Sequence, residues 1–293
     1  MNYVITGHKG LIGESLKARL DQKHKCVGAF DQREGFNINS LNGLELNPET
    51  QKTDILFHLA AQCKINQAIE NPELPHLNNA DGTHAVLEFC RKNKIPKIVN
   101  FSSSRVLSKE RNPYVASKIY GEELVKSYAE CYGIEYITVR PSTVYGPHKD
   151  ITSRLMTNWC KSALNDGELV IFGDKDKTLD FTYISDFVDG IELLINNWDN
   201  TKNDSYNISG NEEVKLFELA EIIIDNTGGG KLVYQDPEIA QPQKVNVDTS
   251  KMIDLGFKPK VNIWEGLTRT LNFFKGERDW NKYSERVKQR LSK

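Results

Sequence analysis

Residues 3–13 read Tyr3-Val4-Ile5-Thr6-Gly7-His8-Lys9-Gly10-Leu11-Ile12-Gly13 and decide the fold of this 293-residue chain. The first four form an apolar run typical of a strand, and residues 11–22 have the pattern of a helix. The glycines between them allow a tight turn and a close approach of the backbone to a pyrophosphate. The start of the helix adds N–H donors and positive partial charge. The stretch therefore predicts a dinucleotide-binding turn that opens a βαβ unit.

Strand-like and helix-like stretches alternate through the first half of the chain. The strand-like runs are rich in Val, Ile and Phe and cover residues 25–30, 54–59, 97–101 and 135–139. Helix-like patterns over residues 79–92 and 112–131 lie between them. Such alternation is typical of parallel strands covered by helices on both faces of the sheet. We expect an α/β fold with a Rossmann-type doubly wound parallel sheet.

The rhythm changes after Pro147. Helix-like stretches at residues 155–165, 216–226 and 263–274 alternate with short strand-like runs such as residues 169–172. We expect a smaller α+β substrate-binding domain over the open edge of the sheet, where α/β folds place ligands. The predicted boundaries are 1–147 for the dinucleotide-binding domain, to which segments near 180–210 return, 148–276 for most of the substrate-binding domain, and 277–293 for a C-terminal helix.

The composition excludes several classes of protein. Hydrophobic residues make up 39% and charged residues 27%, and the net charge of -2 is no electrostatic footprint for nucleic acid. No apolar run is long enough to span a bilayer, and no signal-peptide pattern precedes the first strand. The five cysteines are scattered, without metal-like pairing. We expect a cytoplasmic protein without a metal site, a membrane partner or a nucleic-acid partner.

Asp31 closes the second predicted strand, about twenty residues beyond the glycine turn. A carboxylate at this place accepts hydrogen bonds from the adenosine ribose hydroxyls and repels a 2′-phosphate, which favours NAD over NADP. Lys9 in the turn and Arg33 just after Asp31 are cations that can approach a 2′-phosphate. The prediction is therefore NAD, with NADP left open.

Further motifs follow the glycine turn in a fixed order. They are His58-Leu59-Ala60-Ala61, Asn79 with Gly82-Thr83, Phe101-Ser102-Ser103-Ser104, Tyr114-x-x-x-Lys118, Arg140-Pro141-Ser142-Thr143-Val144-Tyr145-Gly146-Pro147, Gly173-Asp174 leading to Asp180-Phe181, Tyr206-Asn207-Ile208, and Leu255-Gly256-Phe257-Lys258-Pro259. In this order the chain, up to about Gly276, resembles the extended short-chain dehydrogenase/reductase family of nucleotide-sugar epimerases and dehydratases.

The resemblance implies a catalytic unit of Ser103, Tyr114 and Lys118, with Ser102 and Ser104 as alternatives for the serine. Tyr114 and Lys118 are four apart on a predicted helix and so share one face. An ammonium nearby lowers the pKa of a phenol, which then takes a proton from a sugar hydroxyl. The implied cofactor contacts are Gly7, Lys9, Gly10, Leu11, Ile12, Gly13, Asp31, Arg33, Asn37, Ile38, Leu59, Ala60, Ala61, Asn79, Tyr114, Lys118 and Pro141. The implied substrate contacts are Ser104, Thr143, Lys175 and Lys177.

Three departures from the family pattern bear on the reaction. The sugar dehydratases carry an Asp–Glu pair where this chain has Ser104 and Arg105, which argues against 4,6-dehydration. Tyr114 comes only eleven positions after Ser103, which predicts a more open pocket. Leu179 stands where relatives have an arginine for the diphosphate, and a second arginine is missing near Gln241-Pro242. Lys175, Lys177 or Lys244 are candidates to replace these arginines as point charges.

These observations predict an NAD-dependent nucleoside-diphosphate-sugar epimerase that acts at C4. An NADPH-dependent nucleotide-sugar 4-keto reductase is the first alternative, because the GDP-fucose synthases have a similar glycine loop with a basic residue at the position of Lys9. A non-catalytic dinucleotide-binding protein is the second alternative. The resemblance also implies a homodimer that pairs through the helix bearing Tyr114 and a neighbouring helix.

Overall fold

A six-stranded parallel sheet forms the centre of the computed structural model, which describes residues 1–47, 52–148, 154–210, 213–240 and 245–276. Its strands lie in the order β2-β1-β3-β4-β5-β9. Their bounds are β1 Asn2–Thr6, β2 Lys25–Phe30, β3 Ile55–His58, β4 Lys97–Phe101, β5 Glu135–Pro141 and β9 Asp204–Ile208. The inner strands are apolar and buried along most of their length, as expected for a parallel sheet covered on both faces.

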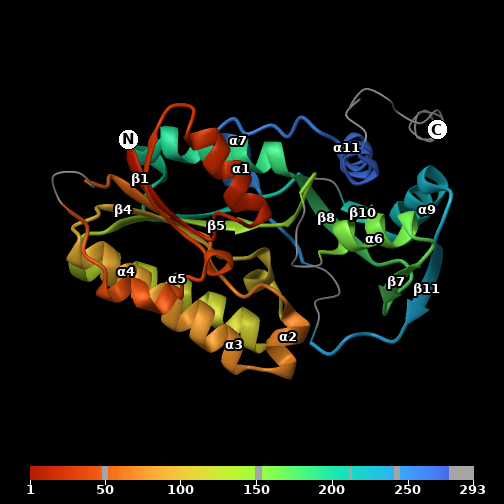
Figure 1. The fold of residues 1–293 in the computed structure, drawn as a ribbon, viewed down its shortest axis with the longest axis horizontal. Helices are drawn as coiled ribbons and strands as arrows, with labels where there is room; N and C mark the ends of the chain where they lie inside the picture. The colour runs from red at the N-terminus through yellow and green to blue at the C-terminus, as the bar shows by residue number, and fades with distance from the viewer. Residues whose placement is uncertain (48–51, 149–153, 211–212, 241–244, 277–293) are drawn as a thin grey trace.

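Helices cover both faces of this sheet. Helices α1 (Leu11–Leu20) and α7 (Ile184–Asn196) lie on one face and contact each other, while α4 (Gly82–Lys92) and α5 (Pro113–Tyr132) lie on the other (Figure 1). The fold is therefore the Rossmann-like α/β fold that the alternating pattern predicts.

The ends of α5 follow from its sequence. The Asn112 side chain caps the first turn by accepting the Val115 N–H at 3.0 Å, and Pro113 occupies the first helical position. Gly133 ends the helix in the left-handed conformation, with φ 70°. These signals fix the helix that carries Tyr114 and Lys118.

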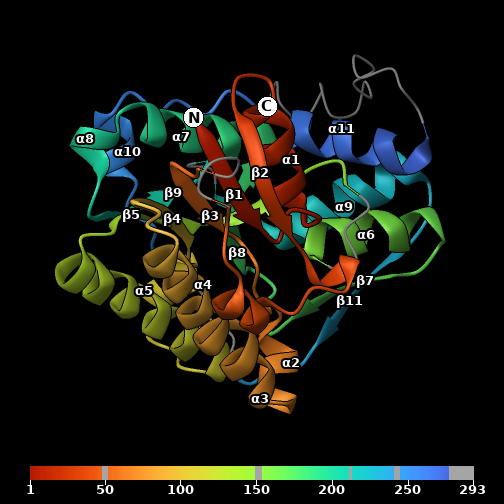
Figure 2. The same ribbon diagram turned by 60° about the vertical axis from the view of Figure 1, so that its left-hand side comes forward.

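A second group of elements lies beside the carboxyl ends of the parallel strands (Figure 1 and Figure 2). It contains a three-stranded sheet in the order β10-β8-β6 and a two-stranded sheet of β11 and β7. The bounds are β6 Thr143–Tyr145, β7 Glu168–Phe172, β8 Thr178–Tyr183, β10 Glu213–Lys215, β11 Lys231–Gln235, α6 Leu155–Leu164, α9 Leu216–Thr227 and α11 Ile263–Lys275. After β8 the chain leaves this group for α7, which covers the six-stranded sheet, and for β9, which is a strand of that sheet. It then returns to the second group at β10.

Short elements complete the described chain. They are α2 Ile65–Glu70, α3 Glu73–Pro75, α8 Trp198–Thr201, α10 Ser250–Asp254 and the single turns η1 Gln32–Glu34, η2 Ile38–Gly43, η3 His76–Asp81 and η4 Ser104–Leu107. The helix predicted over residues 79–92 starts earlier, because a π-helical turn, η3, runs directly into α4. The predicted C-terminal helix at 277–293 lies outside the described residues.

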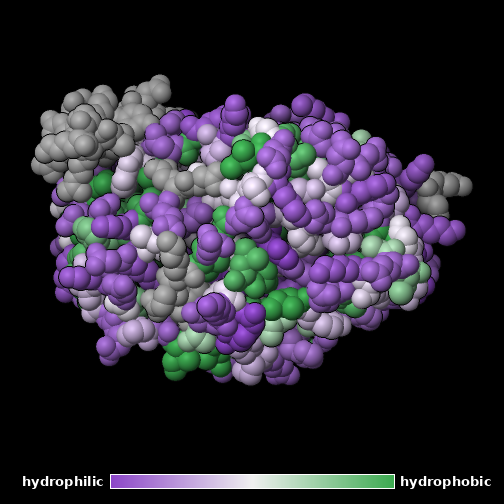
Figure 3. All heavy atoms as spheres, turned by 180° about the vertical axis from the view of Figure 1, so that it is seen from behind, coloured by the Kyte–Doolittle hydropathy of each residue, from purple (hydrophilic) through white to green (hydrophobic). Residues whose placement is uncertain are grey.

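Polar and charged side chains cover most of the face opposite to Figure 1, with small apolar areas among them (Figure 3). Scattered apolar groups of this kind are normal on a folded domain. None of the helices in the described part of the chain has the length and apolar character that a membrane span requires.

His58 ends β3 in the centre of the fold and is 3% exposed. Its two ring nitrogens lie 2.9 Å from Thr6 Oγ1 and 3.1 Å from Thr83 Oγ1. Burial lowers the pKa of His58 to about 3, so the folded protein holds this ring neutral. The unfolded chain binds a proton at His58 below about pH 6.5, and acid therefore favours unfolding.

We expect protonation of His58 in the unfolded chain to lower the free energy of unfolding by about 2 kcal/mol as the pH falls from 7 to 5. The His58→Gln variant should lose that part of the pH dependence, while the exposed His84→Gln variant should keep it. Chemical denaturation of the three proteins at both pH values measures the difference. An unchanged pH dependence in His58→Gln would show that His58 does not resist protonation.

Candidate active site

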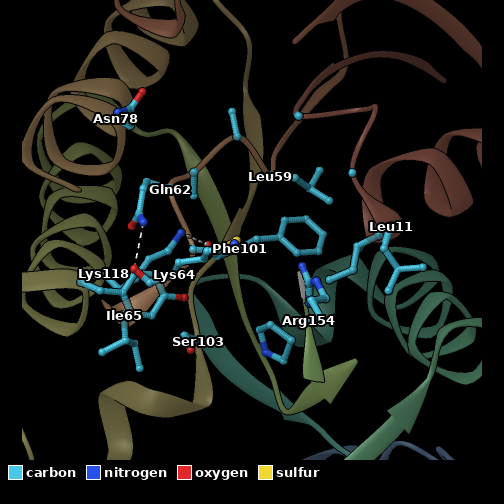
Figure 4. A pocket seen from close by; sticks show the side chains of 18 of the residues that line it. Leu11, Leu59, Gln62, Lys64, Ile65, Asn78, Phe101, Ser103, Lys118 and Arg154 are labelled. Carbon is cyan, nitrogen blue, oxygen red and sulfur yellow. Dashed lines mark hydrogen bonds between the residues drawn. The ribbon is translucent and has the colours of Figure 1, made fainter. Parts of the chain in front are cut away.

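A cavity of about 1090 Å³ opens at the carboxyl ends of the parallel strands, beside the second group of elements. Its walls come from the glycine turn, the ends of β2, β3, β4 and β5, helix α5, and residues in or near β6, β7 and β8. In Figure 4, Leu11, Leu59, Lys118 and Arg154 reach toward it from different elements. Ligands of open α/β sheets bind at this end of the strands.

The glycine turn is packed so closely that side chains do not fit. A Cβ atom on Gly7, whose φ is 74°, would lie 2.6 Å from the Ala60 nitrogen. A Cβ atom on Gly13 would lie 2.2 Å from the Gly7 oxygen. Gly10 lines the cavity, and no side chain caps the first turn of α1 there. The turn therefore presents backbone N–H groups to the cavity and fits the pyrophosphate of a dinucleotide.

Asp31 holds the loop beside this turn in place. Its carboxylate accepts the Lys9 N–H at 2.8 Å and the Arg33 N–H at 2.9 Å. The Lys9 ammonium lies 2.9 Å from a Glu34 carboxylate oxygen, and the Arg33 guanidinium donates to the Lys9 carbonyl. Asp31 and Arg33 line the cavity, whereas Lys9 does not.

Ser103, Tyr114 and Lys118 meet on one wall of the cavity. The phenol of Tyr114, which is 6% exposed, is hydrogen-bonded to Ser103. Lys118 follows one helical turn later, and its ammonium donates to the Phe101 carbonyl at 2.9 Å. Burial lowers the pKa of Lys118 to about 8. Of the three candidate serines, Ser103 is thus the one bonded to the tyrosine.

Burial raises the pKa of Tyr114, against the expectation that Lys118 lowers it. The hydrogen bond from Ser103 opposes this rise, as do the nearby cations Arg154 and Arg105. In the protein by itself the removal of the phenol from water outweighs these groups. The ammonium of Lys118 is directed to the Phe101 carbonyl instead.

Known proteins place this geometry in a family. Residues 3–209 match the NAD dependent epimerase/dehydratase family. The chain belongs to that family. It is 30% identical to a putative UDP-glucose 4-epimerase of Methanocaldococcus jannaschii, over 93% of this chain and 98% of that protein.

Two solved structures of family members have the same fold. UDP-glucose 4-epimerase from Thermotoga maritima, crystallised with UDP-glucose, superposes with a TM-score of 0.84 at 23% identity, over 94% of this chain and 99% of that one. UDP-glucose 4-epimerase from Thermus thermophilus, in complex with NAD, gives a TM-score of 0.84 at 21% identity, over the same shares.

Most of the residues that the family motifs single out line the cavity of this epimerase/dehydratase family member. They are Gly7, Gly10, Leu11, Ile12, Gly13, Asp31, Arg33, Asn37, Ile38, Leu59, Ala60, Ala61, Ser103, Ser104, Tyr114, Lys118, Pro141, Thr143 and Lys177. Lys175 is exposed and does not line the cavity, and Lys244 lies outside the described residues.

Asn79 is buried away from the cavity. Its side-chain oxygen accepts the Gln62 N–H at 2.8 Å, and its amide nitrogen lies 3.0 Å from the Gln62 carbonyl and 2.9 Å from Ser117 Oγ. The residue therefore fixes the loop after β3 against α5. In this structure it shapes the cavity wall rather than facing a cofactor.

Two arginines of the cavity wall were not predicted as site residues. Arg105 follows the three serines in η4, and Arg154 precedes α6. Sequence reasoning treated Arg105 only as a missing acid, and no local pattern marks Arg154. Both arginines act on the pKa of Tyr114. They do so because the fold brings together segments that are far apart in the sequence.

Proposed function

We propose that this protein is an NAD-dependent nucleoside-diphosphate-sugar 4-epimerase. The proposal rests on the Tyr114 phenol, which is hydrogen-bonded to Ser103. Tyr114 lies one helical turn from Lys118, and the cavity that contains these residues also contains the glycine turn. The relatives named UDP-glucose 4-epimerase support the same reaction.

The cofactor would be held by this chain's own groups. The backbone N–H groups of residues 11–13 would bind the pyrophosphate, and Asp31 would face the adenosine ribose and disfavour a 2′-phosphate. Both Asp31 oxygens already hold the loop through the Lys9 and Arg33 amides, so the carboxylate is fixed in place. When bound, NAD supplies the reversible acceptor for a hydride from the sugar carbon.

Proton movement falls to Tyr114. As the phenolate, Tyr114 takes the proton of the sugar C4 hydroxyl while that carbon gives up its hydride, and as the phenol it returns the proton when the carbon is reduced on its other face. Ser103 orients the phenol and the sugar oxygen through its hydroxyl. Lys118 lies one turn away, and burial lowers its pKa to about 8. Its hydrogen bond goes to the Phe101 carbonyl, so its positive charge would favour the phenolate only through space.

The diphosphate would be held without the arginines usual at position 179 and near residue 241. Lys177 and Arg154 both line the cavity and are half-buried. Burial and the nearby Arg105 lower the pKa of Lys177. An anionic diphosphate between these cations offsets their desolvation and their repulsion. Of the proposed substitutes, Lys177 is therefore the better candidate, because Lys175 is exposed and does not line the cavity.

Dehydration is disfavoured by the residues beside Ser103. Removal of water from the sugar needs an acid and a base, and Ser104 and Arg105 provide neither near neutral pH. Reduction of a 4-keto sugar by NADPH uses the same tyrosine and is the main alternative. The Lys9 ammonium is paired with Glu34 and Lys9 does not line the cavity, which argues against its use for a 2′-phosphate.

The protein's assembly and compartment are further parts of the proposal. Tyr120 and Tyr132 are 47% and 55% exposed on α5, which leaves aromatic surface for pairing of two copies. All five cysteines are free thiols, as is usual in the reducing cytoplasm. We expect a cytoplasmic homodimer. Sedimentation of the purified protein measures how many copies assemble.

The test of the proposed function is mass spectrometry of the small molecules released on denaturation, followed by NMR of incubations with UDP-, GDP-, CDP- and dTDP-sugars. Stoichiometric NAD with conversion of one sugar to its C4 epimer supports the epimerase. NADPH consumed only with 4-keto sugars identifies a reductase. Bound cofactor without any turnover identifies a non-catalytic binding protein.

A further inference from the structure

Arg105 is a cavity cation to which the proposed reaction at C4 gives no anionic partner. It lies in η4, two residues after Ser103, and its backbone N–H donates to the Ser103 hydroxyl at 3.2 Å. Its half-buried side chain lines the cavity together with Ser104 and Tyr114. Desolvation lowers the pKa of Arg105, and the negative charges that Tyr114 and Glu110 can carry oppose this through space.

No carboxylate of the described residues forms an ion pair with the Arg105 guanidinium. Glu110, the carboxylate that acts on it, accepts a hydrogen bond from the Ser108 hydroxyl instead. A second cation, Lys177, lies close enough to Arg105 for its own pKa to be lowered. A desolvated arginine beside another cation is costly unless an anion joins it. The cavity is therefore short of negative charge at this point.

The residues that line the whole cavity also carry more positive than negative charge. Its lining carries two carboxylates, Asp31 and Glu238, against six cations: Arg33, Lys64, Arg105, Lys118, Arg154 and Lys177. Arg33 lies at the adenosine end beside Asp31, and Arg154 and Lys177 are the groups proposed for the diphosphate. Lys118 belongs to the catalytic group. Of the two cations that then remain, Lys64 and Arg105, it is Arg105 that acts on the pKa of Tyr114, where the tyrosine would meet the sugar.

Arg105 lies two residues after Ser103 and acts on the pKa of Tyr114, which limits the part of the sugar that it can reach. If Tyr114 and Ser103 hold the oxygen on C4, the next ring carbon is C5, and C5 bears C6. Dehydratases must place their acid and base across C5 and C6, since a C4 ketone makes the C5 hydrogen acidic and the leaving hydroxyl is on C6. The corresponding positions here are Ser104 and Arg105.

We infer that Arg105 binds a carboxylate at C6 of the sugar, so that the preferred substrates are nucleoside-diphosphate hexuronic acids. The inference rests on the proposed C4 epimerisation. The planar guanidinium presents paired N–H donors that match the two oxygens of a carboxylate, and Ser104 adds a hydroxyl from the same turn. A neutral hexose, whose C6 carries a hydroxyl, leaves the arginine without an anion and binds less well.

The experiment compares matched sugars that differ only at C6, and variants that differ only at position 105. The sugars are UDP-glucose with UDP-glucuronic acid, and UDP-N-acetylglucosamine with the corresponding uronic acid. The variants are Arg105→Met, which removes the charge, and Arg105→Lys, which keeps the charge without the planar fork. Lys109→Met removes an exposed charge from the same loop, outside the cavity, and serves as the control.

In the wild-type protein we expect kcat/KM for a uronic acid to exceed that for its neutral partner by about 10-fold or more. Arg105→Met should lower the uronic acid value by about 30- to 100-fold and the neutral value by a clearly smaller factor, which measures the effect of Arg105 on the pKa of Tyr114. Arg105→Lys should fall between, and Lys109→Met should match the wild type. Retained NAD and an unchanged melting temperature show that each variant folds.

Several results would overturn the inference. Preference for the neutral sugar, an unchanged preference in Arg105→Met, or absence of turnover of every uronic acid each excludes a carboxylate at Arg105. Equal losses on both members of a pair would show that Arg105 acts on the diphosphate or on Tyr114, and not on a group at C6. Epimerisation of neutral sugars in any of these cases leaves the proposed function standing, whereas a protein that epimerises no sugar refutes both.

Discussion

Replacing Tyr114 with phenylalanine is expected to lower kcat by about 10³-fold, the range that positioned acid–base groups contribute. The change removes one hydroxyl from a buried ring and leaves the packing of that ring on α5 intact. It removes the group that exchanges a proton with the sugar oxygen, and also the hydrogen bond to Ser103. The measurement is turnover of the sugar that the wild-type protein epimerises, with cofactor content determined in parallel.

Tyr120→Phe is the matched control for this variant. Tyr120 lies on the same helix but is 47% exposed, so loss of its hydroxyl should leave kcat within about 2-fold of the wild type. Tyr114→Phe should retain NAD, because the glycine turn and Asp31 are untouched. A Tyr114→Phe protein that turns over at a wild-type rate would remove this residue from the chemistry.

Gly13→Ala is expected to abolish cofactor retention and to lower the free energy of unfolding by about 1–3 kcal/mol. The added Cβ would lie 2.2 Å from the Gly7 oxygen and 2.8 Å from the His8 Cα, and both are backbone atoms that move only if the turn moves. The N–H groups at the start of α1 would then lose their alignment toward the pyrophosphate. Mass spectrometry of released NAD and chemical denaturation measure the two effects.

Gly43→Ala provides the comparison for Gly13→Ala. A Cβ on Gly43 meets nothing within 4 Å, so this substitution should leave both cofactor content and stability close to the wild type. If Gly13→Ala retained NAD as the Gly43 variant does, the tight turn would not be the cofactor site.

The parallel sheet could be predicted from sequence because its signals are local. Apolar runs predicted β4 at residues 97–101 to the residue, and the glycine turn predicted where α1 begins. The helix predicted to begin at residue 79 begins earlier, because η3 precedes α4 with a π-helical turn that has no simple sequence period.

The cavity wall was harder to predict, because its members depend on long-range packing. Lys175 and Lys177 are two residues apart, yet only Lys177 lines the cavity. The Asn79 motif predicted a cofactor contact, whereas its side chain is bonded to Gln62 and Ser117. Arg154 comes from the segment before α6, and nothing near it in the sequence indicates that it lies close to Tyr114.

The fate of the C4 hydrogen tests the account most directly. The protein, with its own bound cofactor and none added, is incubated with a nucleotide sugar that it converts and that carries deuterium at C4. We predict that the C4 epimer keeps the deuterium at C4, since one carbon gives and regains the same hydride without exchange with water. Loss of the label to solvent, or its appearance in cofactor released to solution, would contradict transient oxidation at C4 by this protein.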